Sequence, residues 1–296
     1  MELFNTADWK RFFTELYNKV MDTDAFGDAA RIAFYFSFAF FPLLLFLVSL
    51  FGIILESTEE WKAELYVYLA QIMPASAYEL VRDTLEEIVE GGTGGKVTLG
   101  LLITLYSASA GVDNLRAGLN SVYEEDEKRS WWWTKLLALL LTLLFIILIG
   151  VALIVVTAGW KLVQVGFQYI GLDVSSPYVL GAIQWVSVFV VMVFVTAVIY
   201  SVLPSFKEFK WVWITPGAIV AIILWLVLTT GFKVYLQYFN TYNKTYGSLG
   251  AVIILMLWMY LTAVAVLIGG AINSVLTEMS EADKEEGDLA ASTDLV

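Results

Sequence analysis

The sequence contains no cysteine and no histidine. Without cysteine the chain can form no disulfide, no thiol nucleophile and no thiolate metal site. Without histidine it lacks the side chain that most often acts as a general base and as a ligand of transition metals. These two absences remove the residue types behind many hydrolytic and metal-dependent enzymes, so we expect no cofactor and no catalytic site.

Charge is also scarce. Of the 296 residues, 16% are charged and 59% are hydrophobic, and the mean hydropathy is +0.75. A soluble domain of this length carries more charge and less apolar surface. The composition therefore predicts an integral membrane protein.

Long apolar runs give the expected architecture. A bilayer core about 30 Å thick needs roughly 20 apolar residues of helix, and the runs lack the period-two alternation of barrel strands. We expect an all-α polytopic membrane bundle with six transmembrane helices. The predicted spans are residues 32–55, 97–118, 136–160, 178–203, 211–232 and 247–275, in a single membrane domain of residues 1–278.

Three further segments are predicted outside the spans. Residues 3–20 and 75–90 place apolar side chains at helical spacing, which predicts amphipathic helices at the N-terminus and in the first external loop. Residues 279–296 are acidic and have little to bury. That segment is therefore predicted to be a disordered cytoplasmic tail.

The distribution of lysine and arginine predicts the orientation. Eleven of these residues lie on the side of the two termini and six on the other, so both termini are expected in the cytoplasm. The first apolar run begins only at residue 32 and is too long for a signal peptide. The stretch "WWWTK", residues 131–135, is typical of an interfacial aromatic belt with a lysine that reaches to lipid headgroups.

The second span, in "LYSASAGVDNLRAGLNSVY", carries the main candidate site. Its charge-free part has only sixteen residues, so a crossing helix must continue past Asp113 and Arg116. A polar stripe at helical spacing follows one face, with one neighbouring asparagine. Its residues are Ser109, Asp113, Asn114, Arg116 and Asn120. The stripe either lines a transport path or marks where the helix leaves the membrane.

Four ordered blocks resemble one known family. The blocks "ARIAFYFSFAFFPLLLFLVSLFG", "LGLLITLYSASAGVDNLRAGLNSVYE", "YSVLPSFKEFKWVWITPGAIVAIILW" and "YNKTYGSLGAVIILMLWMYLTAVAVLIGGAINSVL" are similar to the YihY/BrkB family of bacterial inner-membrane proteins, over roughly residues 28–278. Members of that family have six spans, which implies the same count here. The family pattern carries over, without assigned roles, to Ser37, Pro42, Ser107, Gly111, Pro204, Pro216, Gly217, Tyr246, Gly247 and Trp258.

The resemblance implies a location in the bacterial inner membrane and a role connected with envelope properties or with transport of lipid or lipopolysaccharide. An older family label, ribonuclease BN, implies RNA hydrolysis instead. Hydrolysis of RNA needs metal-binding carboxylates or histidines beside a basic surface. This chain has no histidine and a net charge of −12, so we expect neither nuclease activity nor a nucleic-acid partner.

Two hypotheses remain at the level of the sequence. The first is a transporter or a translocase of lipids or envelope components, which uses the polar stripe of the second span. The alternative is a structural or scaffolding envelope protein that acts through its amphipathic helices. Membrane lipids are the expected partners in either case, and a homo-oligomer is left open.

Overall fold

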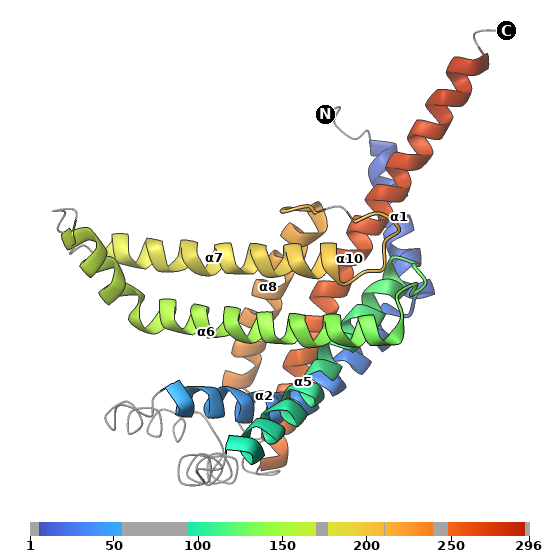
Figure 1. Ribbon diagram of the computed structural model, residues 1–296. Helices are drawn as coiled ribbons and strands as arrows, with labels where there is room; N and C mark the ends of the chain where they lie inside the picture. Colours follow the sequence, from blue (N-terminus) through green and yellow to red (C-terminus); the bar gives the residue numbers. More distant parts are fainter. Residues whose placement is uncertain (1–5, 55–93, 170–176, 210, 239–247, 294–296) are drawn as a thin grey trace.

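Seven helices make up the part of the chain that the computed structural model describes, residues 6–54, 94–169, 177–209, 211–238 and 248–293 (Figure 1). No strand occurs among these residues, so the all-α prediction is confirmed for them. The helices are α1 (Thr6–Asp22), α2 (Ala25–Ile54), α5 (Gly94–Val122), α6 (Trp131–Tyr169), α7 (Pro177–Val202), α8 (Pro216–Tyr238) and α10 (Ser248–Thr293). The helix predicted at 75–90 lies outside the described residues.

Four of these helices are long and apolar enough to cross a membrane. The stretches that qualify among the described residues are Trp131–Gly150, Trp185–Val202, Pro216–Leu236 and Val252–Lys284. They fall on the third to sixth predicted spans, and helices α2 and α5 occupy the positions of the first two. The chain is thus a helical membrane protein, while the count of six spans stays a prediction.

Helix α10 is the central helix of the bundle and packs against four of the other described helices. It contacts α1, α2, α5 and α8, and its position between them is visible in Figure 1. Its buried face carries Ala263, Leu267 and Ala271 at intervals of four residues, which places them in one row. The two alanines of this row let neighbouring backbones approach closely, as small residues usually do between membrane helices.

Helices α6 and α7 run side by side and extend away from α10 (Figure 1). Helix α6 also contacts α5, so the α6–α7 pair is joined to the rest of the bundle through α5 and through a short contact of α7 with α8. A hydrogen bond from Tyr200 Oη to the carbonyl oxygen of Val266, 2.8 Å, ties α7 to α10 as well. The C-terminal end of α7 is therefore held against α10.

The end of α10 differs from the sequence prediction. Disorder is expected from residue 279, yet α10 continues without a break to Thr293. The reason is the contact with α1: Met279 is buried beside Phe12, and Arg11 forms an ion pair with Asp283 at 3.8 Å. Tertiary contact gives the start of the acidic segment a surface to bury, which composition alone does not reveal.

Helix α1 confirms the predicted amphipathic N-terminal helix, and one side of it is buried against the bundle. Phe12, Lys19 and Val20 are buried toward the bundle. A row of large apolar residues beside this buried face is exposed. These are Trp9, Phe13, Tyr17 and Met21.

Candidate functional site

The polar stripe lies on α5, which runs from Gly94 to Val122 without interruption. The helix therefore does continue past Asp113 and Arg116, as a spanning second helix requires. Ser109 is fully buried and Asn120 is 6% exposed, so the stripe faces the inside of the bundle at both of its ends. This orientation is the one that an intramembrane polar stripe adopts when it has a partner or a function.

Asp113 and Arg116 form the ion pair that their spacing predicts. The Nε and Nη2 atoms of Arg116 donate to Oδ1 of Asp113 at 3.0 and 2.9 Å. The arginine side chain is 13% exposed and the aspartate side chain 34%. A largely buried guanidinium is costly unless it is paired and hydrogen-bonded, and Asp113 supplies part of that pairing.

Glu127 completes the pairing and was not singled out from the sequence. It lies in the α5–α6 loop, and its Oε2 accepts a hydrogen bond from Nη1 of Arg116. Arg129 also binds it, from the backbone N–H at 2.9 Å and from Nε at 2.8 Å. The only signal in the sequence is the mixed charge run "EEDEKR", residues 124–129, which resembles an ordinary solvated loop.

The electrostatics of Glu127 follow from these contacts. Burial raises the pKa of its carboxyl group, but the hydrogen bonds from Arg129 and the charges of Arg129 and Arg116 outweigh burial and lower the pKa from 4.5 to about 2. Glu127 is therefore ionised at neutral pH. It holds two arginines that belong to different segments of the chain.

Asn120 and Arg129 connect this cluster to the end of α7. Asn120 accepts a hydrogen bond from the backbone N–H of Ser205 at 2.8 Å and donates to Glu127 at 3.2 Å. Arg129 donates to the carbonyl oxygens of Val202 and Leu203 at 3.2 and 2.7 Å. The last carbonyls of a helix have no partner within it, so Arg129 acts as a cap for α7.

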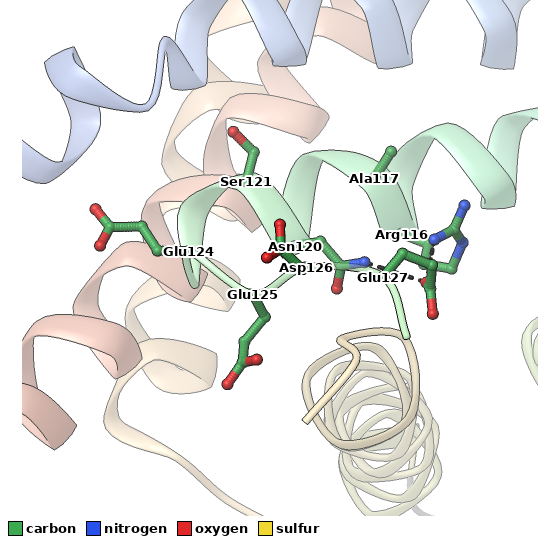
Figure 2. Close-up of a pocket in the computed structure, with 8 residues that line it drawn as sticks. All are labelled: Arg116, Ala117, Asn120, Ser121, Glu124, Glu125, Asp126 and Glu127. Carbon is green, nitrogen blue, oxygen red and sulfur yellow. Dashed lines mark hydrogen bonds and ion pairs between the residues drawn. The ribbon is translucent and has the colours of Figure 1, made fainter. Parts of the chain in front are cut away.

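A hollow of about 470 Å³ opens beside this cluster. Figure 2 shows Arg116 and Glu127 together at one side of it and Glu124 at the other. The remaining lining residues come from the end of α5 and the loop that follows. They are Ala117, Asn120, Ser121, Glu125 and Asp126.

The rim of the hollow is acidic, but its carboxylates are largely engaged. Glu124 pairs with Lys19 at 3.0 Å, and Glu125 pairs with Lys128 at 3.2 Å. Among the residues described, no group of three or more acidic, histidine or cysteine side chains is placed to hold a metal ion. Of the charged side chains that line the hollow, Arg116 is the least exposed, and it is paired with Asp113 and Glu127.

Two members of the predicted stripe bond only to their own helix. Ser109 Oγ donates to the carbonyl oxygen of Tyr106 at 2.7 Å, and Asn114 Nδ2 donates to that of Ala110 at 2.8 Å. The structure therefore brings together Asp113, Arg116 and Asn120 and leaves Ser109 and Asn114 outside their network. Sequence spacing cannot separate these two groups, because all five positions lie near one another on the helix.

Of the family-pattern positions described in α2 and α5, two serines bond within their own helices and Gly111 lies in a contact between the helices. Ser37 is buried and donates to the carbonyl oxygen of Ala33 at 2.7 Å, while the exposed Ser107 donates to that of Ile103 at 2.9 Å. A Cβ at Gly111 would approach the ring of Phe36 to 3.0 Å. Glycine therefore permits the contact between α5 and α2.

The positions near α8 surround the start of that helix. Pro204 is buried in the α7–α8 connection, and Pro216 is the first residue of α8, where proline costs no helical hydrogen bond. The backbone N–H of Gly217 donates to Asn273 Oδ1 of α10 at 2.8 Å.

Trp258, Pro42, Tyr246 and Gly247 are the remaining family-pattern positions. The ring of Trp258 lies 6.5 Å from that of Trp225, between α10 and α8. Pro42 lies within α2, with its side chain outside the described set. Tyr246 and Gly247 lie outside the described residues altogether.

Comparison with known proteins adds a family and no mechanism. A sequence model described as virulence factor BrkB matches residues 16–294. YfkH of Bacillus subtilis, named as a ribonuclease-like protein, is 29% identical over 265 residues, which cover 90% of this chain and 94% of that protein. No solved structure matches.

Proteins of Xanthomonas named UPF0761 membrane proteins are similar at comparable identity. One from X. campestris pv. campestris is 27% identical over 281 residues, 92% of this chain. One from X. oryzae pv. oryzae is 27% identical over 278 residues, 91% of this chain. The chain spans 61% and 60% of the length of these two relatives.

Proposed function

The chain belongs to the virulence factor BrkB family of membrane proteins, and from that premise we propose that it is a transporter or a translocase of lipids or envelope components. The observation that carries the proposal is the inward-facing ion pair of Asp113 and Arg116 beside an open hollow of about 470 Å³. Ionisable residues that face the inside of a membrane bundle commonly belong to substrate or ion paths.

The path that we propose ends at this hollow and uses Asp113, Arg116 and Asn120. A polar or charged headgroup that enters the hollow meets Arg116, whose bonds to Asp113 and Glu127 can be exchanged for bonds to the substrate. We further place the protein in a bacterial inner membrane with both termini in the cytoplasm, because eleven of its 17 basic residues flank the spans on that side.

The proposal excludes RNA hydrolysis as the function. The name of the relative in Bacillus subtilis says that it is ribonuclease-like. The present chain has no histidine, and its net charge of −12 repels a phosphate backbone. Neither property suits binding and cleavage of RNA.

The experiment is a lipid-movement assay in liposomes that hold the purified protein. The rate at which inner-leaflet fluorescent phospholipid becomes accessible to an impermeant quencher is compared between the wild type and the D113N/R116Q variant. We expect the variant to lose this movement. The matched control is R11Q/D283N, which removes an exposed ion pair that lies away from the hollow and should leave the rate unchanged.

The scaffold alternative is favoured by one specific observation. Arg116 is already bound by two carboxylates, and Asn120 ties the same helix end to Ser205, as in a static joint. Equal rates for the wild type and D113N/R116Q would support that alternative and reject the transport path. A loss of movement in R11Q/D283N as well would reject the assignment to α5.

A further inference from the structure

Lys135 carries a charge that no part of the proposed path uses. It lies four residues after Trp131, near the start of α6, and its Nζ sits 4.2 Å from the centre of the Tyr106 ring of α5. Within the described residues it forms no ion pair with a carboxylate, in contrast to Lys19 and Lys128. A cation held only by an aromatic face still has its donors available for an anion.

An apolar slot of about 90 Å³ lies farther along α6. Its walls come from α2, α5, α6 and α10, and its only polar side chain, Thr142, donates to the carbonyl oxygen of Ala138. The other lining residues are Phe36, Ala39, Phe40, Ala108, Val112, Phe145, Ile146, Ile149 and Met259. Apolar cavities of about 150 Å³ stay dry and accept hydrocarbon, so this slot suits a few methylene groups and not water.

Lys135 and the slot lie on the same face of α6. Thr142 and Ile149 follow Lys135 at intervals of seven residues, which is two turns each and keeps the side chains in one row. At 1.5 Å per residue, Thr142 lies about 10 Å along the helix from Lys135. A cationic group and an apolar slot at that separation match the two ends of an amphiphile.

The surface around the slot continues into the outer surface of α6. Ile149 both lines the slot and is 43% exposed, so the slot opens at the outer surface of α6 there. In a membrane protein, exposed apolar helix faces meet lipid hydrocarbon. The slot is therefore continuous with the face on which acyl chains lie.

We propose that α5 and α6 form a binding site for one phosphoglycerolipid of the surrounding bilayer, with its phosphate at Lys135 and Tyr106 and part of one acyl chain in the slot. The negative phosphate complements the ammonium group, and the exposed Trp131, Trp132 and Trp133 mark the level at which headgroups lie. The inference rests on the proposed function and deepens it, because it names the class of molecule that would be moved. Binding is nevertheless measurable without transport.

The test uses the full chain in lipid nanodiscs that contain a photoactivatable probe with a diazirine in its acyl chain. Two probes with the same chains are compared, a phosphatidylglycerol and a diacylglycerol. Cross-linked peptides are then mapped by mass spectrometry. For the wild type we expect labelling in residues 106–112 and 135–149, stronger for the phospholipid by roughly tenfold, the factor that about 1.4 kcal/mol of binding gives.

Each half of the site has its own variant and matched control. K135Q should remove the preference for the phospholipid and keep labelling by diacylglycerol, while K128Q, which removes a lysine from the preceding loop, should change neither. I149W fills the mouth of the slot and should lower labelling by both probes. I103F adds a ring to an exposed position of α5 outside the slot and should not.

The outcomes separate this inference from the proposed function. Equal labelling by the two probes in the wild type, or labelling that I149W leaves unchanged, would overturn the lipid site. Labelling as expected together with unaltered lipid movement in D113N/R116Q would keep the lipid site and reject the transport path. Altered labelling in K128Q or I103F, to the extent seen in K135Q or I149W, would overturn the assignment to Lys135 and the slot.

Discussion

Gly217 lies where the backbones of α8 and α10 approach each other closely. A Cβ at this position would overlap the carbonyl oxygen of Gly269 and approach Cγ of Asn273 to 2.6 Å. We expect G217A to lower the stability of the folded protein by about 1–3 kcal/mol, the usual cost of overpacking. Unfolding in detergent, followed by loss of helical circular dichroism, measures the change.

The matched control for this prediction is G231A on the same helix. A Cβ at Gly231 meets nothing within 4 Å, so that variant changes helix propensity alone and should be neutral or stabilising by up to about 1 kcal/mol. If G217A and G231A had the same free energy of unfolding, the close contact between α8 and α10 would not require a glycine at position 217.

At the scale of elements, Lys19 joins α1 to two other parts of the chain. Its side chain is 7% exposed, and its Nζ lies 2.7 Å from Glu278 of α10 and 3.0 Å from Glu124 after α5. Burial lowers the pKa of Lys19, but the bonds and charges of the two glutamates outweigh burial and raise it. Lys19 thus carries a positive charge and holds α1 against α10 through its ion pair with Glu278.

We expect K19Q to loosen α1 and to expose Met279, which is 7% exposed in the folded protein. Because the chain contains no cysteine, an M279C variant provides a single labelling site for a maleimide. The labelling rate should rise by roughly tenfold in M279C/K19Q, as a loss of about 1.4 kcal/mol gives. M279C/K10Q is the control, and an equal rise there would assign the effect to charge in general.

At the scale of the whole molecule, Glu127 links α5, the α5–α6 loop and the end of α7. Its pKa is lowered from 4.5 to about 2 in the folded protein, so the unfolded chain binds a proton first as pH falls. The stabilisation by ionised Glu127 is therefore complete well above pH 4.5 and is lost as pH falls through 4.5 towards 2.

The corresponding prediction concerns the difference in melting temperature between the wild type and E127Q. This difference should be constant above about pH 5.5 and should shrink as pH falls through 4.5 towards 2. Differential scanning fluorimetry in detergent at a series of pH values measures it. A difference that stayed the same down to about pH 2.5 would mean that the charge of Glu127 contributes nothing to folding.

Much of the fold was predictable because the bilayer restricts the choices. Long apolar runs must be helical to satisfy their backbone groups, and all the described helices except α1 overlap the predicted spans. The errors are at the ends: α8 begins at Pro216 and not at 211, and α10 runs on to Thr293. Helix ends depend on caps and tertiary contacts, which hydropathy does not record.

The candidate site was predictable only along α5. Because Asp113 and Arg116 are three residues apart on one helix, local geometry alone brings them together, and the sequence by itself determined that pair along with the class of the protein. Only the tertiary structure decided that Glu127 and Arg129 join it, that Asn120 reaches Ser205 85 residues away, and that Lys135 lies over Tyr106. Those contacts depend on how separate helices pack, and residue spacing within one helix carries no information about that packing.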